Sequence, residues 1–128
     1  MRVLLDTQAF LWFITDDSKL SVSARSLIEN PDNERLFSIA SLWETAIKMS
    51  LGKLELEKPF EELIPRQLEL NDIDVLAIEI EQLKKVAALP FHHRDPFDRL
   101  IIVQSLVEQL PIVSSDTKFD DYGIERLW

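Results

Sequence analysis

Four carboxylates scattered along the sequence are the residues best suited to chemistry: Asp6, Glu44, Asp98 and Asp116. Carboxylates brought close together raise each other's pKa, and a hard divalent cation relieves that repulsion. Oxygen-only ligands favour Mg²⁺ or Mn²⁺ over zinc. Such ions activate water and stabilise the leaving oxygen of a phosphodiester. The chemistry to expect from these residues is therefore metal-dependent hydrolysis that needs no protein nucleophile.

The segments around these acids alternate between predicted strands and predicted helices. Short apolar runs predict strands at residues 2–5, 35–39, 73–78 and 111–114, with a short fifth strand within 123–128. Apolar periodicity and terminating residues predict helices at 9–14, 21–29, 41–51, 60–70, 79–88 and 95–110. Only two glycines and no linker-like stretch interrupt the chain, which predicts one domain over residues 1–128. The alternation predicts a three-layer α/β fold, with a mostly parallel sheet of four or five strands flanked by helices.

The four acids are expected at one edge of that sheet. Asp6 follows the first predicted strand and Asp116 follows the fourth. Glu44 falls in the first turn of the helix after the second strand. Asp98 falls in the first turn of the helix that leads into the fourth strand, and this helix begins at the same edge. Ligand sites of open parallel sheets lie beyond the carboxyl ends of the strands, so this placement predicts convergence.

Each acid also has a purely structural interpretation. Asp6 is a candidate N-cap for the helix that follows it. Glu44 matches a capping box with Ser41, which would bond its side chain to the helix start. Asp98 suits the positive end of a helix dipole, and Asp116 suits a turn cap. Taken singly these interpretations are strong. The common edge of the sheet is what favours a metal site.

The composition indicates a soluble globular chain, with 46% hydrophobic and 29% charged residues. No apolar run approaches the roughly 18 residues that span a membrane, and the start is too short and too acidic for a signal peptide. Cysteine is absent, which excludes disulfides and thiolate chemistry. We therefore expect a cytoplasmic protein with no membrane partner.

The formal net charge of −9 argues against nucleic-acid binding by general electrostatics, because proteins that bind in that way are usually basic. Metal ions that are held by carboxylates invert the local charge, so an acidic chain can still act on phosphodiesters. An acidic surface can equally bind a basic segment of a partner protein. The charge alone leaves both possibilities open.

Four motifs surround the acids, and together they resemble those of a known family. They are Val3-Leu4-Leu5-Asp6-Thr7, Ser38-Ile39-Ala40-Ser41-Leu42-Trp43-Glu44, His93-Arg94-Asp95-Pro96-Phe97-Asp98-Arg99-Leu100-Ile101 and Val113-Ser114-Ser115-Asp116. In type and order they resemble the motifs of PIN-domain nucleases, and specifically the VapC-like toxins of type II toxin–antitoxin pairs. The resemblance covers nearly the whole chain, and it implies a PIN-like fold.

The resemblance also implies an activity and partners. It implies a Mg²⁺- or Mn²⁺-dependent endoribonuclease, with Asp6, Glu44, Asp98 and Asp116 as metal ligands and catalytic residues. It further implies an RNA substrate, a homodimer, and a cognate antitoxin that covers the acidic site. Asp95 could share or replace the role of Asp98. The alternative function is a non-catalytic PIN-fold module that binds RNA or protein, and DNA cleavage stays open.

Several neighbours of the acids are candidates for supporting roles. Thr7 and Ser115 could orient the ligands or a water through their hydroxyls, although turn hydrogen bonds are equally expected. Arg94 and Arg99 could contact RNA phosphates, or could pair with neighbouring acids.

Two further features near the acids carry structural expectations. His92 and His93 are adjacent, and adjacent side chains do not converge on one ion, so we do not expect them to bind metal. Lys48 lies four residues after Glu44, which predicts an ion pair on the helix surface.

Overall fold

Five parallel strands form a central sheet in the order β3-β2-β1-β4-β5. The structure is a computed structural model that describes residues 1–128 throughout. The strands are β1 (Arg2–Leu5), β2 (Glu34–Ser38), β3 (Ile73–Leu76), β4 (Ile112–Val113) and β5 (Arg126–Leu127). All four strand pairings are parallel. The predicted α/β class and the short fifth strand are confirmed.

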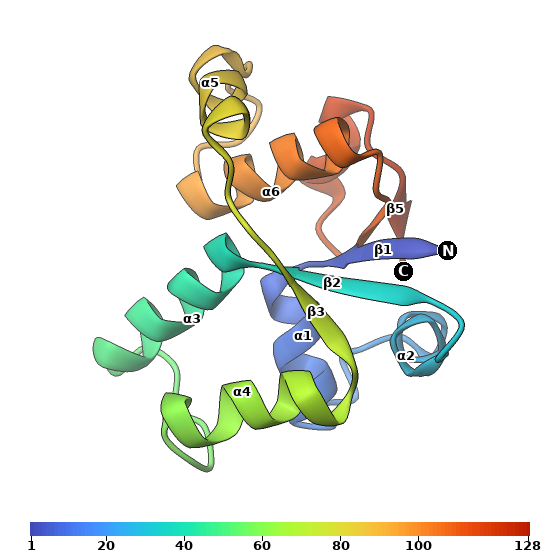
Figure 1. The fold of residues 1–128 in the computed structure, drawn as a ribbon, viewed down its shortest axis with the longest axis vertical. Helices are drawn as coiled ribbons and strands as arrows, with labels where there is room; N and C mark the ends of the chain where they lie inside the picture. Colours follow the sequence, from blue (N-terminus) through green and yellow to red (C-terminus); the bar gives the residue numbers. More distant parts are fainter.

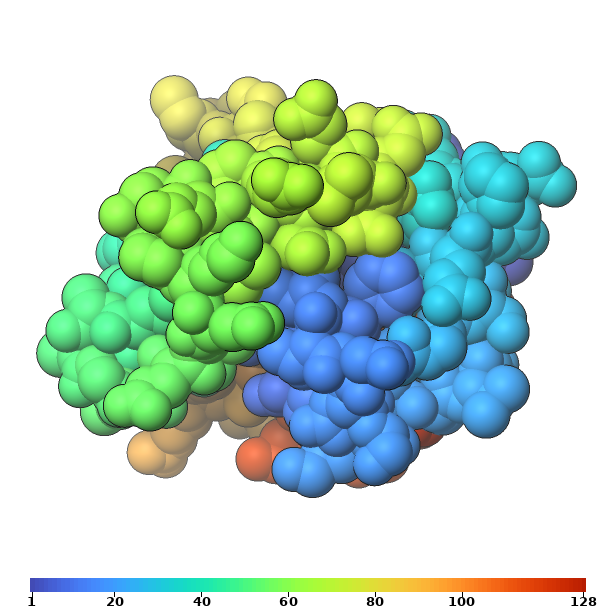
Figure 2. All heavy atoms as spheres, turned by 90° about the horizontal axis from the view of Figure 1, so that it is seen from below, coloured from blue at the N-terminus to red at the C-terminus, as the bar shows by residue number.

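Helices cover both faces of the sheet. They are α1 (Thr7–Ile14), α2 (Val22–Glu29), α3 (Ile39–Ser50), α4 (Phe60–Leu70), α5 (Ile80–Ala88) and α6 (Pro96–Glu108), and a 3₁₀ helix, η1, spans Thr117–Tyr122. Figure 1 shows α5 and α6 on one side of the sheet and α1, α2 and α4 on the other. Figure 2 looks onto the second side, where α4 in green lies against the blue N-terminal helices. None of the helices combines the length and the apolar character that crossing a bilayer requires.

The central strand β1 contributes to both halves of the core. Val3 and Leu5 pack into a cluster with α1, α2 and α4, whereas Leu4 packs into a second cluster with α6 and η1. All three side chains are fully buried. Successive side chains of a strand point to opposite faces, and both faces of β1 are covered. This is why β1 is an uninterrupted apolar run in the sequence.

The helix that carries Glu44 begins earlier than predicted. Ser38, the last residue of β2, is the N-cap of α3, and its hydroxyl accepts a hydrogen bond from the Ala40 amide at 3.0 Å. The predicted capping box between Ser41 and Glu44 is therefore wrong. The chain passes from β2 into α3 without a loop, so Ser41 lies inside the helix and Glu44 lies in the second turn, not the first.

Other boundaries shift by one or a few residues. α1 begins at Thr7, with only Asp6 between it and β1, and β3 ends at Leu76, short of the predicted residue 78. β3 is an edge strand, and only its first residue, Ile73, is buried. The predicted end of α3 is confirmed, because Gly52 follows the helix with a φ of +70°, which glycine adopts without steric cost.

The strand order creates a crevice beside β1. β1 pairs with β2 on one side and with β4 on the other, so the connections that leave β1 and β4 run in opposite directions. Such a switch point is where open α/β sheets bind ligands. Asp6 follows β1 and Asp116 follows β4, so both lie at this crevice.

Candidate active site

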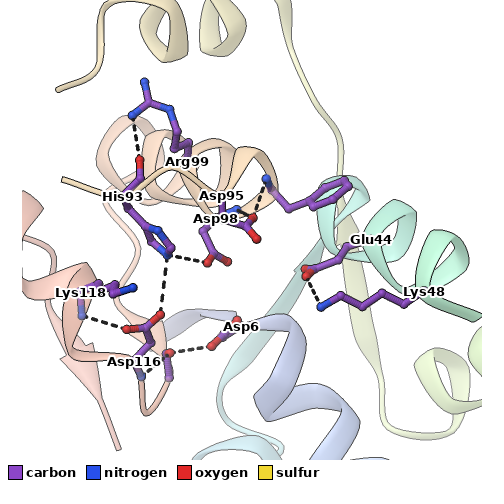
Figure 3. Close-up of polar contacts among 11 residues, drawn as sticks. Asp6, Glu44, Lys48, His93, Asp95, Asp98, Arg99, Asp116 and Lys118 are labelled. Carbon is purple, nitrogen blue, oxygen red and sulfur yellow. Dashed lines mark hydrogen bonds and ion pairs between the residues drawn. The ribbon is translucent and has the colours of Figure 1, made fainter. Parts of the chain in front are cut away.

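An acidic cavity of about 470 Å³ lies at the carboxyl edge of the sheet. Five carboxylates are among its lining residues: Asp6, Glu44, Asp95, Asp98 and Asp116. Figure 3 shows these side chains directed into a common region from α3, α6 and the ends of β1 and β4. The structure thus brings together acids that are up to 110 positions apart, from Asp6 to Asp116.

Asp6 is a buried carboxylate at the end of β1. Only 8% of the residue is exposed. Burial raises the pKa of Asp6 to about 6; a hydrogen bond from Ser114 acts in the opposite direction, and the charges of Glu44 and Asp116 raise the pKa further. Asp6 occupies the N-cap position of α1, but its side chain makes no capping hydrogen bond. Asp6 thus stands at the predicted capping position, but the side-chain hydrogen bond to its carboxylate comes from Ser114.

Ser114 is the neighbour of Asp6 that sequence analysis missed. Its hydroxyl donates to Asp6 Oδ2 at 2.6 Å and accepts from the Asp116 amide at 3.0 Å. The sequence predicts this supporting role for Ser115, which is exposed and lines the cavity. The pairing of Leu5 with Val113 places the next residues, Asp6 and Ser114, side by side. This register is the signal that would have found Ser114.

Glu44 presents an unpartnered oxygen to the site. Its side chain is 7% exposed, and Oε2 accepts a hydrogen bond from Lys48 Nζ at 2.7 Å. That bond raises the pKa of Lys48. The other oxygen, Oε1, is buried and has no hydrogen-bond partner. The expected pair with Lys48 is present, and it leaves half of the carboxylate free for a ligand.

The two acids of the third motif have different surroundings. Asp95 Oδ1 accepts hydrogen bonds from the amides of Phe97 at 2.9 Å and Asp98 at 3.0 Å, so Asp95 is the N-cap of α6. Asp98 lies one turn further and faces the other acids (Figure 3). Burial raises the pKa of Asp98 to about 8, and the charges of Asp6, Asp95, Glu44 and Asp116 contribute in the same direction. The surroundings of Asp98 thus disfavour its ionised form.

Asp116 has one oxygen engaged and one directed toward the site. Oδ1 accepts from the Lys118 amide at 3.0 Å and caps η1, as the structural interpretation of this acid predicted. Oδ2 lies 3.7 Å from His93 Nε2. The cap therefore orients Asp116 and leaves its second oxygen available.

His93 joins the acids, which sequence analysis did not predict. Its Nε2 lies 2.7 Å from Asp98 Oδ2, as Figure 3 shows. His92 turns away and packs edge-on against the ring of Tyr122, with 5.0 Å between ring centroids. The two histidines diverge, as expected of neighbours. One of them nevertheless meets the acids, because the segment before α6 folds back over the site.

Arg99 does not have the predicted role in RNA contact. The residue is 5% exposed, and its guanidinium donates to four backbone carbonyls, those of Val86, Leu89, Pro90 and His93. A guanidinium with these bonds is not available to a phosphate, nor does it pair with an acid. Arg94 is exposed, and its contact with RNA stays a prediction.

The donor set fits a hard divalent cation. Its oxygens come from carboxylates, with the Thr7 hydroxyl nearby, and Thr7 Oγ1 is buried without a hydrogen-bond partner, as is Glu44 Oε1. Burial and neighbouring acids raise the pKa values of Asp6 and Asp98, so the protein itself offers little compensation for their ionised forms. A cation bound by these oxygens would satisfy both the unpartnered atoms and the charge.

Comparison with known proteins identifies the family and the fold of the chain. A family model described as PIN domain matches residues 3–125. Among solved structures, the chain is similar to one described as VapBC2 from Rickettsia felis bound to a DNA fragment from their promoter. The TM-score is 0.71, the identity is 17%, and the match covers 100% of both chains. No curated protein matches the sequence.

Proposed function

From the premise that this chain belongs to the PIN domain family, we propose that it is a metal-dependent endoribonuclease and the toxin of a type II toxin–antitoxin pair. Members of the family are nucleases, which supports hydrolysis of phosphodiesters as the general activity. One observation carries the proposal for this chain. Carboxylates from α3, α6 and the ends of β1 and β4 converge on one cavity, and buried oxygen atoms there lack partners.

Four residues would hold Mg²⁺ or Mn²⁺: Asp6, Glu44, Asp98 and Asp116. All are carboxylates, the ligand type that these two ions prefer. The chemistry that a bound ion supplies here is activation of water and stabilisation of the leaving oxygen of the phosphodiester. Asp95 is the weaker candidate, because one of its oxygens already accepts two backbone hydrogen bonds.

The protein's own groups orient the ligands of this site. The Ser114 hydroxyl holds Asp6 Oδ2, and the Lys118 amide holds Asp116 Oδ1, so neither carboxylate is free to rotate. Asp98 gives up a proton when positive charge arrives, because its pKa of about 8 reflects burial and repulsion. Lys48 supplies positive charge beside Glu44, and Lys53 lines the same cavity, where it can contact a phosphate.

The toxin assignment rests on the sequence motifs and on the likeness to the Rickettsia felis VapBC2 structure. An antitoxin segment that enters this cavity needs basic side chains, because the lining is rich in carboxylates and the chain carries a net charge of −9. We propose that such a segment inhibits the enzyme by occupying the acidic site, and that the toxin acts as a homodimer of a 128-residue domain in the cytoplasm.

Cleavage of a labelled RNA by the purified chain tests the proposal. We expect cleavage with Mg²⁺ or Mn²⁺ and none with EDTA. Asp6→Asn and Asp98→Asn lower the rate on the order of a hundredfold or more, because each removes a ligand charge while preserving shape. Asp121→Asn is the matched control, since Asp121 is exposed and outside the cavity lining.

Two results would contradict the proposal. If the Asp6 and Asp98 variants cut RNA as fast as the parent, these acids do not serve the reaction. If the parent binds Mn²⁺ but cleaves no RNA in the absence of any antitoxin, the chain is a binding module of the same fold and not an enzyme.

A further inference from the structure

His93 places a buried ring nitrogen against two of the acids in the site. Its Nε2 is 2.7 Å from Asp98 Oδ2, which is the length of a strong hydrogen bond. The atom is buried, yet no hydrogen bond of acceptable direction reaches it. Buried polar atoms in folded proteins nearly always have a partner, so an exception calls for an explanation. A partner that the protein itself does not supply would provide one.

Three atoms around this position have the spacing of metal ligands. They are His93 Nε2 and one carboxylate oxygen each from Asp98 and Asp116, and they all lie within 4.8 Å of one another. Ligands at about 2.1 Å from an octahedral ion are about 3 Å apart when adjacent and about 4.2 Å apart when opposite. The separations of 2.7 Å and 3.7 Å from Nε2 to the two carboxylates are close to this range.

The segment that carries His93 is held firmly. Arg99 donates to the His93 carbonyl at 3.3 Å and to the Pro90 carbonyl at 2.9 Å. The Tyr122 hydroxyl donates to the same Pro90 carbonyl at 2.9 Å. The His93 ring also lies against Phe119, which is fully buried. These contacts come from α6 and η1, and they fix the backbone and the ring of His93 beside the site.

We propose that His93 is a fifth protein ligand of the active-site metal, which it binds through Nε2 together with Asp98 and Asp116. This inference rests on the proposed function, since it assumes that the acids bind a divalent cation. It adds a nitrogen donor to an otherwise all-oxygen site. Mg²⁺ is a hard ion that takes oxygen ligands, whereas Mn²⁺ belongs to the first-row transition ions, which accept a nitrogen ligand more readily. A nitrogen ligand at this position would therefore favour Mn²⁺ over Mg²⁺.

Pulsed electron paramagnetic resonance of Mn²⁺ bound to the full chain tests the proposal without measuring activity. A directly bound imidazole nitrogen modulates the Mn²⁺ echo. We expect this modulation in the parent protein, and we expect it to change to the ¹⁵N pattern when the protein is grown with ¹⁵N-labelled histidine. His93→Gln abolishes it, and His92→Gln, the matched control, retains it because His92 faces Tyr122.

Calorimetry of Mn²⁺ and Mg²⁺ binding gives a second readout. His93→Gln should weaken Mn²⁺ binding by roughly tenfold or more and Mg²⁺ binding by less, so that the ratio of the two affinities falls. The labelled parent tests the idea even if the variant is unstable.

The outcomes separate this inference from the proposed function. If Mn²⁺ binds to the parent without a nitrogen signal, or if the signal survives in His93→Gln, His93 is not a ligand, but the acids still hold the metal. If Mn²⁺ does not bind to the parent at all, both this inference and the proposed metal-dependent activity are wrong.

Discussion

The Ser114 hydroxyl donates a 2.6 Å hydrogen bond to Asp6 Oδ2 and joins residues that are 108 positions apart. The same hydroxyl accepts from the Asp116 amide. It thus links the acid after β1 to the acid after β4 across the switch point of the sheet. A single small side chain sets the relative positions of two candidate ligands.

Removal of that hydroxyl should weaken metal binding. The hydrogen bond from Ser114 stabilises the ionised form of Asp6. Ser114→Ala removes this donor, so the pKa of the buried Asp6 rises further. We expect Mn²⁺ affinity to fall on the order of tenfold, as measured by calorimetry. Ser115→Ala is the control and should change the affinity little, because Ser115 is exposed. If Ser115→Ala weakens Mn²⁺ binding and Ser114→Ala does not, Ser115 is the supporting residue.

The stability of the metal-free protein should fall as the pH rises. Asp98 has a pKa of about 8 in the folded chain against 3.8 as its ordinary value, so the folded state binds the proton more tightly than the unfolded state. The free energy of unfolding therefore decreases between about pH 4 and about pH 8 and levels off above that. Asp6, with a pKa of about 6, contributes over the lower part of this range.

Thermal unfolding in EDTA across this pH range measures the effect. Asp98→Asn should flatten the profile and raise the melting temperature at about pH 8, because the amide carries no charge to repel the other acids. Added Mn²⁺ should stabilise the parent most at high pH, where the carboxylates are ionised. A parent that becomes more stable from about pH 5 to about pH 8 in EDTA would contradict this account.

Two substitutions at Asp95 separate its capping role from its charge. Asp95→Ala removes the acceptor for the Phe97 and Asp98 amides and should lower stability by about 1 kcal/mol. Asp95→Asn keeps an acceptor at the N-cap and should be nearly as stable as the parent. Both variants should retain RNA cleavage within a few-fold. If Asp95→Asn loses cleavage as completely as Asp98→Asn, Asp95 is itself a ligand.

Arg99 should matter for stability much more than its neighbour in the same motif. Arg99→Lys cannot serve four carbonyls at once, since an ammonium lacks the planar fork of a guanidinium. We expect a loss of about 3 kcal/mol or more in chemical denaturation, because buried carbonyls are left without donors. Arg94→Ala should change stability by less than about 0.5 kcal/mol, since Arg94 is exposed. Equal effects of the two substitutions would contradict the structural role of Arg99.

Local sequence signals were sufficient for the fold class and for the edge where the acids gather. The apolar run of β1 and the alternation of strands with helices are properties of neighbouring residues, and they predicted a parallel sheet. Asp6 and Asp116 directly follow strands, so their place at the carboxyl edge follows from those strands alone. The Asp95-Pro96 start of α6 is likewise a local pattern, and it was predicted correctly.

Contacts between distant segments decided the rest of the site. The sequence pattern placed Ile39 at the end of the strand and began the helix at Ser41, whereas the pairing of β2 with β3 ends at Ser38, which is the N-cap of α3. Ser114 was missed in favour of Ser115 because their relation to Asp6 depends on the register between β1 and β4.

His93 and Arg99 depend on the path of the segment before α6, which the sequence by itself did not determine. Arg99 holds that segment through backbone carbonyls, and carbonyls are identical at every residue, so no pattern of side chains reveals the bond. His93 reaches the acids because that bonding, together with contacts from η1, holds the segment in place. Side-chain periodicity determined the elements and one edge of the sheet, whereas strand register and backbone hydrogen bonds, which act between distant residues, decided which side chains meet there.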